Sequence, residues 1–144
     1  MGEVTGIALR ARPRAPMQQL DQTEITLAAG LTGDFRGAVP GRQVTVLSEE
    51  GWLAACAELG EELPWVTRRA NLLLRGVELK GRIGGRLRVG DALLIITDEC
   101  EPCSVMERAR GGLRRALLSG WRGGATCRVA RGGLVRLGDA AELF

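Results

Sequence analysis

The sequence predicts a mainly β fold, with the strands in a closed or partly closed barrel and a few short helices inserted between them. Short segments rich in β-branched and aliphatic residues recur at intervals of roughly 8 to 15 residues. Turn-forming glycine is abundant, with 21 glycines in 144 residues. Stretches with helical periodicity are few and short. A doubly wound α/β fold is the less favoured alternative.

The N-terminal part of the chain contains three strand-like segments. Residues 3–10 alternate in polarity until two prolines break the pattern. Residues 24–28 and 42–47 are enriched in β-branched residues and are expected to be further strands. Between them, residues 30–34 form a loop with two glycines, which allow close backbone approach to a ligand.

A helix is expected over residues 49–59. Ser48 provides an N-cap, and the two glutamates that follow favour the helix N-terminus. Cys56 recurs with a tryptophan and a leucine at helical spacing, so we expect its thiol to lie in the core. Gly60 ends the helix.

The middle of the chain is expected to return to strands. Residues 71–74, an asparagine followed by three leucines, predict a buried strand. Residues 76–90 carry frequent glycines around short strands and turns. Residues 92–97 are apolar enough for a strand buried on both faces. This strand leads directly to Cys100.

The C-terminal part combines helices and strands. A helical pattern runs from residue 104 to about residue 118 and is divided by Gly111 and Gly112. Residues 126–130 and 134–137 are expected to be strands joined as a hairpin through residues 131–133.

The composition favours one domain over residues 1–144, because 45% hydrophobic residues suffice for one continuous core. No apolar run approaches the roughly 18 residues of a membrane span, and the acidic N-terminus does not resemble a signal peptide. We therefore expect a soluble, cytoplasmic protein without a membrane association. Oligomeric state is not predicted.

The charge is carried by arginine, since Lys80 is the single lysine among 20 basic residues and the net charge is +3. Guanidinium groups make bidentate contacts to phosphate or carboxylate, so an arginine-lined pocket suits an anionic cofactor. An arginine-rich composition can also reflect a GC-rich genome. With 3% aromatic residues and no tyrosine, base stacking has little support, and nucleic-acid binding is not expected.

The chain contains no histidine. This excludes Ser-His-Asp and Cys-His catalysis, histidine metal ligands and an imidazole general base. Thiols, carboxylates and arginines must therefore carry any chemistry.

The segment Cys100-Glu101-Pro102-Cys103 is the strongest candidate for a functional motif. It follows a buried strand and precedes a helix, so Cys103 is expected at or just before a helix N-terminus, where free N–H groups stabilise a thiolate.

Four interpretations of this cysteine pair remain open. A thioredoxin-like dithiol requires a βαβ context that the surroundings do not provide. A structural zinc site requires two more ligands, and only Cys56 and Cys127 remain. A purely structural pair or a disulfide is the third interpretation. We favour the fourth, a functional thiol that carries sulfur or binds a soft metal such as molybdenum.

Other candidate site residues lie at the ends of predicted strands. Arg42 opens one strand, while Arg68, Arg69 and Asn71 stand just before or at the start of another. Each could be a solvated surface group. If the barrel closes, they are expected to converge with the glycine loop on the thiol.

Five blocks in this order resemble the MOSC family, the molybdenum-cofactor sulfurase C-terminal domain, and the resemblance runs from Gly2 to about Asp139. The blocks are Gly30-Leu31-Thr32-Gly33-Asp34, Arg42-Gln43-Val44-Thr45, Arg68-Arg69-Ala70-Asn71-Leu72, Gly84-Gly85-Arg86-Leu87-Arg88-Val89-Gly90-Asp91 and Cys100-Glu101-Pro102-Cys103.

The resemblance implies a β-barrel-like fold of the MOSC type and a family cysteine that matches Cys103. In the family this thiol accepts sulfur from pyridoxal-phosphate-dependent cysteine desulfurases, or ligates molybdenum in enzymes that reduce N-hydroxylated compounds. Carried over to this chain, Cys103 is the thiol and tentative molybdenum ligand, assisted by Cys100. The implied anion-site residues for the molybdenum cofactor (molybdopterin) are Arg42, Arg68, Arg69, Asn71, Gly33 and Asp34.

The chain also departs from the family pattern. Relatives commonly have histidine two residues after the aspartate of the glycine loop, where this chain has Arg36. No pyridoxal-phosphate site is apparent, and we expect a stand-alone, bacterial-type domain that requires a cysteine desulfurase or a molybdoenzyme as partner. Whether it is itself an enzyme stays open. The alternatives are a non-catalytic cofactor- or partner-binding adaptor and a dithiol redox protein that uses Cys100 and Cys103.

Overall fold

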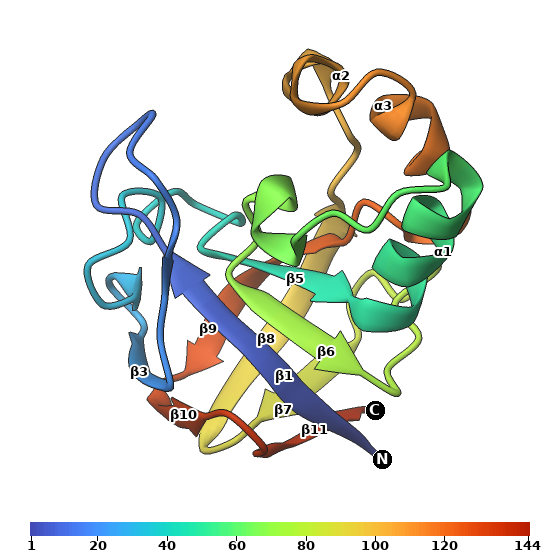
Figure 1. The fold of residues 1–144 in the computed structure, drawn as a ribbon. Helices are drawn as coiled ribbons and strands as arrows, with labels where there is room; N and C mark the ends of the chain where they lie inside the picture. The colour runs from blue at the N-terminus through green and yellow to red at the C-terminus, as the bar shows by residue number, and fades with distance from the viewer.

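Seven strands form a closed ring in the computed structural model, which describes all residues 1–144 (Figure 1). The ring closes because the last strand pairs antiparallel with the first. In order around the ring, the strands are β1 (Gly2–Leu9), β6 (Leu72–Arg75), β5 (Val44–Ser48), β9 (Ala125–Arg131), β8 (Ala92–Glu99), β7 (Arg86–Val89) and β11 (Ala140–Leu143). The predicted β-barrel fold is confirmed.

Four further strands complete the β structure. The two-residue strand β2 (Gln18–Gln19) pairs with the end of β1. A separate three-stranded sheet has the order β10 (Gly133–Arg136), β3 (Gln22–Thr26) and β4 (Gly30–Leu31). Part of the predicted glycine loop is therefore a short strand, and the turn begins only at Thr32.

The core lies inside the barrel because alternate residues of each strand point inward. In β8, Ala92, Leu94 and Ile96 are almost fully buried, while the residues between them are half-buried. This strand therefore has one inner face and one partly covered outer face, and the expectation that both faces are fully buried is wrong.

The helices gather on one side of the barrel, where they cover a second apolar cluster (Figure 1). Cys56 lies in this cluster with Trp52, as expected for a core thiol. The helices are α1 (Glu49–Leu59), α2 (Ser104–Ala109) and α3 (Leu113–Ala116), and the 3₁₀ helices are η1 (Trp65–Arg68) and η2 (Ser119–Trp121). None of them has the length and apolar character needed to cross a membrane.

The predicted ends of α1 are confirmed. The Ser48 hydroxyl accepts the N–H of Gly51 at 3.1 Å, and Gly60 adopts a left-handed conformation with φ of 69°. The break between α2 and α3 also falls where the sequence places it, with Gly112 at φ of 88°.

The predicted hairpin between residues 126–130 and 134–137 is wrong. Strand β9 pairs with β5 and β8, whereas β10 pairs with β3 of the other sheet. The glycines between them serve close packing, because a Cβ atom on Gly132 would lie 2.6 Å from the carbonyl oxygen of Ile25. A Cβ atom on Gly133 would lie 2.5 Å from the backbone of Asp91. The chain thus crosses between two sheets here.

Candidate functional site

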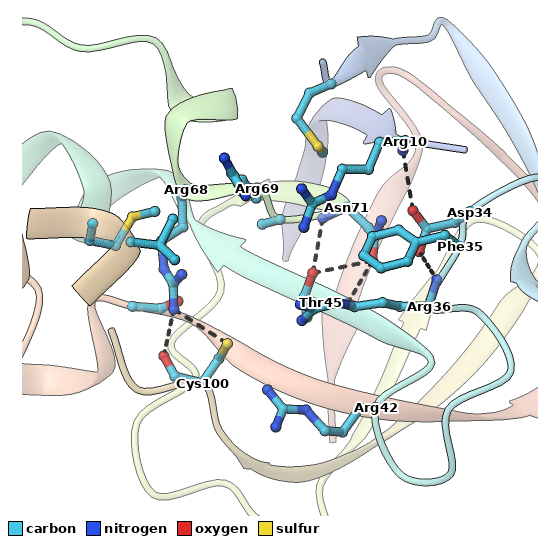
Figure 2. A pocket seen from close by; sticks show the side chains of 15 residues that line it. Arg10, Asp34, Phe35, Arg36, Arg42, Thr45, Arg68, Arg69, Asn71 and Cys100 are labelled. Atoms are coloured by element: carbon cyan, nitrogen blue, oxygen red, sulfur yellow. Dashed lines mark hydrogen bonds between the residues drawn. The ribbon is translucent and has the colours of Figure 1, made fainter. Parts of the chain in front are cut away.

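A pocket of about 110 Å³ opens at one end of the barrel (Figure 2). Its walls come from the end of β1, the turn after β4, the beginning of β5, the segment from η1 into β6, and the segment between β8 and α2. The polar and charged side chains that line it are Arg10, Asp34, Arg36, Arg42, Thr45, Arg68, Arg69, Asn71 and Cys100.

The pocket is strongly cationic. Five arginines line it, and Asp34 is the only carboxylate among the lining residues. None of these arginines forms a salt bridge, because the three salt bridges of the chain involve Arg75, Arg110 and Arg122. The oxygens of Asp34 instead accept the backbone N–H groups of Arg10 and Arg36 at 3.3 and 3.4 Å. The five arginines are therefore not paired in salt bridges, and their positive charge exceeds the single negative charge of Asp34.

Arg68 ties the cysteine motif to the barrel. Its Nε donates to the carbonyl oxygen of Gly123 at 2.9 Å, and its Nη2 donates to the carbonyl oxygen of Cys100 at 2.9 Å. The same Nη2 approaches the sulfur of Cys100 at 3.3 Å (Figure 2). This contact holds the Cys100 sulfur beside the guanidinium at the pocket wall.

Gly123 leaves the space that this arrangement needs. A Cβ atom at this position would lie 2.5 Å from the carbonyl oxygen of Cys100 and 3.4 Å from Nη2 of Arg68. Only glycine allows the Cys100 backbone to pass this close. Gly123 is not among the site residues predicted from the sequence.

Phe35 lies between two of the arginines. The guanidinium carbons of Arg10 and Arg36 lie 4.7 and 5.2 Å from the centre of its ring, within the range of cation–π contact. Arg10 is largely buried, and burial together with Arg69 and Arg36 lowers its pKa. The negative charge of Asp34 acts in the opposite direction on that pKa.

Arg10 and Phe35 line the pocket but are not among the site residues predicted from the sequence. Arg10 follows directly after β1, and so stands at a strand end as Arg42 does. The strand-end argument applied to the other arginines could have found it. No comparable signal marks Phe35.

The side chain of Asn71 lines the pocket and is hydrogen-bonded to two neighbouring segments. Its Oδ1 accepts from the backbone N–H and the hydroxyl of Thr45 at 3.0 and 3.1 Å, and its Nδ2 donates to the carbonyl oxygen of Ala8 at 3.1 Å. These bonds join β1 and β5 at the start of β6. One N–H of the side-chain amide has no partner within the protein and can serve a ligand.

Gln43 holds the segment that carries Arg42. Its Nε2 donates to the carbonyl oxygens of Leu27 and Gly37 at 2.7 and 3.1 Å, and its Oε1 accepts the N–H of Val129 at 2.9 Å. Three stretches of backbone meet at this one amide. These hydrogen bonds fix the loop that carries Arg42 in the pocket wall.

The structure separates the two cysteines of the motif. Cys100 is partly buried and lines the pocket, whereas Cys103 is exposed and does not line it. Cys103 occupies the N-cap position of α2, as the sequence predicts. Both thiols are free. Gly33 lies outside the pocket wall and supplies the turn before Asp34, with φ of 92°.

The acidic residues that flank Cys100 in sequence do not line the pocket. Burial raises the pKa of Glu99, and the negative charges of Glu101 and Asp98 raise it further. No cluster of three or more histidine, cysteine, aspartate or glutamate side chains is arranged to hold a metal ion. Cys100 and Asp34 are the lining side chains of these four types that could ligate a metal ion.

Comparison with known proteins identifies relatives of the chain. The sequence model of the MOSC domain matches residues 32–142. No curated protein sequence is significantly similar to the chain.

The fold is similar to that of several solved structures. YuaD from Bacillus subtilis superposes with a TM-score of 0.83 at 20% identity, covering 99% of this chain and 96% of that protein. YiiM from Geobacillus stearothermophilus gives a TM-score of 0.78 at 15% identity, covering 100% of this chain and 75% of YiiM. YiiM from Escherichia coli gives 0.74 at 20% identity, covering 99% and 69%. At these identities the similarity concerns the fold alone.

Proposed function

Because the chain belongs to the MOSC domain family, which is associated with molybdenum-cofactor proteins, we propose that its arginine pocket holds the anionic part of that cofactor beside the cysteine pair. One observation carries the proposal. Five arginines without a carboxylate partner share one pocket with the thiol of Cys100.

The lining residues fit such a group. Arg10, Arg36 and Arg42 suit a phosphate, because guanidinium groups bind phosphate oxygens in pairs. A thiolate suits molybdenum, which accepts soft sulfur ligands. When bound, the cofactor would supply a molybdenum centre that accepts a thiolate ligand and takes part in atom transfer.

Arg68 has a different role from the other arginines. Its hydrogen bonds to the carbonyl oxygens of Gly123 and Cys100 occupy it within the protein. It is therefore a positioning residue that holds the Cys100 sulfur at the pocket wall. The anion is left to the arginines whose guanidinium groups have no carbonyl partner.

The two cysteines suit two different tasks. Cys103, which matches the family cysteine, is exposed and accessible to a partner protein, whereas Cys100 faces the pocket. In sulfur transfer, the thiolate of Cys103 attacks the terminal sulfur of a persulfide on a cysteine desulfurase. The sulfur–sulfur bond of the donor breaks, and the donor leaves as a thiolate. If molybdenum is bound, Cys103 or the pocket-lining Cys100 would supply a thiolate ligand to it.

The test is the molybdenum and pterin content of the protein purified from a cell that synthesises the cofactor. Wild-type protein is expected to carry both in near-equimolar amounts. Loss of molybdenum and pterin in the Cys100→Ser or the Cys103→Ser variant identifies the thiol that holds them. The Arg42→Gln variant should carry less of the cofactor, because Arg42 lines the pocket. Arg128→Gln is the matched control, because Arg128 is exposed and lies outside the pocket. Wild-type protein with neither molybdenum, pterin nor a persulfide would contradict the proposal.

A further inference from the structure

A second groove continues outward from the arginine pocket. It lies between residues 14–17, the 3₁₀ helix η1 and helix α2, which stand at the same end of the barrel (Figure 1). Four residues line both the pocket and the groove, namely Met17, Arg69, Val105 and Met106. The groove is therefore contiguous with the wall that carries Cys100.

The groove combines an apolar floor with positive charge. Met17, Val66, Val105 and Ala109 contribute apolar surface, and no acidic residue lines it. Its charges are Arg14, Arg69 and Arg108. None of these three arginines forms a salt bridge.

We infer that this groove binds the apolar body of a small substrate that carries a carboxylate or another negative group. The apolar floor would cover the hydrocarbon part, while Arg14 and Arg108 would pair with the charge at the outer end. The rest of the substrate would then extend past Met17 into the pocket, toward Cys100. This inference rests on the proposed function, because it assigns the substrate class of the same site.

The test compares two probes of the same shape, 4-phenylbutyrate and the uncharged 4-phenylbutyramide. Binding is followed by the methyl NMR signals of Val66 and Val105 in the protein comprising residues 1–144. The carboxylate is expected to bind about tenfold more tightly than the amide, since two partly exposed ion pairs contribute a preference of this order. The double variant Arg14→Gln/Arg108→Gln should reduce the preference to about twofold or less.

A matched control replaces two exposed arginines outside the groove, Arg128→Gln and Arg136→Gln, and should leave the preference unchanged. Equal binding of the two probes, or a preference that survives the groove variant, would overturn the inference.

A second measurement separates this inference from the proposed function. Inorganic phosphate should bind the arginine pocket and protect Cys100 from alkylation in both the wild type and the groove variant. Wild-type protein without a carboxylate preference, but with phosphate protection intact, would overturn the groove alone. Absence of phosphate protection, with the arginine-dependent preference present, would overturn the proposed function and leave the groove as a ligand site.

Discussion

The guanidinium of Arg68 reaches across 32 residues of sequence to the carbonyl oxygen of Cys100 at 2.9 Å and to its sulfur at 3.3 Å. Through this contact, the segment before β6 fixes the segment after β8. A buried cation therefore contributes to holding the cysteine motif, beside the backbone hydrogen bond from Cys100 to Gly124. Both ends of this contact lie in the wall of the same pocket.

Arg68→Ala should lower the free energy of unfolding by about 2–4 kcal/mol. The substitution leaves the carbonyl oxygens of Gly123 and Cys100 without their donor in a largely buried setting, which accounts for a cost of this size. Urea denaturation measures the change. Arg42→Ala is the control, because Arg42 is exposed and should change the stability by about 0.5 kcal/mol or less. Equal effects of the two substitutions would show that Arg68 is not a structural clamp.

Gly123→Ala should disrupt the pocket. Its new Cβ atom would lie 2.5 Å from the carbonyl oxygen of Cys100, so the backbone must shift, at a cost of roughly 1–3 kcal/mol. Gly111→Ala is the matched control, since the nearest atom to its Cβ would be a carboxylate oxygen of Glu107 at 3.9 Å. Thermal denaturation and the alkylation rate of Cys100 measure the two effects. A Gly123→Ala protein with normal stability and normal Cys100 reactivity would refute this role for the glycine.

Asn71→Leu should cost about 2–4 kcal/mol of unfolding free energy. It removes the three side-chain hydrogen bonds that link Thr45 and Ala8, and it leaves buried backbone groups unpaired. Thr45→Val should cost less, because the backbone N–H of Thr45 keeps its bond to Asn71. Chemical denaturation of the two variants gives the comparison. A larger loss for Thr45→Val would contradict the central place assigned to Asn71.

Stability should fall as the pH rises from about 9 to about 12. Burial raises the pKa of Cys127 from 9.0 to about 12, so the folded protein retains a proton that the unfolded chain releases. Unfolding therefore releases a proton in this window, and the free energy of unfolding declines by about 1.4 kcal/mol per pH unit at most. Because the chain has no tyrosine and a single lysine, few side chains other than its thiols have ordinary pKa values in this window.

Urea denaturation at several pH values tests this decline, and Cys127→Ala is the reference. The variant should be less stable at neutral pH, because it leaves a small cavity, but it should show a shallower decline. An identical slope in the two proteins would mean that another group causes the pH dependence.

The barrel could be predicted largely from local pattern. Alternating segments such as residues 3–10 and the capped helix over residues 49–59 are determined by nearby residues, and the structure confirms them. The strand β10 could not be placed in this way. Its partner is β3, more than 100 residues earlier, and the glycines before it are typical of a hairpin turn as well as of close packing.

In the site, too, nearby residues in the sequence predict some features, whereas others depend on residues that are distant in the sequence. The sequence identified Arg42, Arg68, Arg69 and Asn71, and the structure brings all four to one pocket. It did not distinguish their tasks, because the hydrogen bonds that occupy Arg68 and Asn71 come from residues distant in sequence. It also did not show that Cys100, and not Cys103, lines the pocket, since two cysteines three residues apart have the same local signals.

The most direct test of the central claim, that the arginines and Cys100 form one anion site, is the alkylation rate of each cysteine as inorganic phosphate is added. Iodoacetamide labelling followed by mass spectrometry resolves Cys100 from Cys103, and sodium chloride of equal ionic strength is the control. Phosphate should slow the labelling of Cys100 and leave that of Cys103 unchanged, and Arg42→Gln should require more phosphate for the same effect. A Cys100 rate that does not respond to phosphate, or equal protection of both cysteines, would contradict the claim.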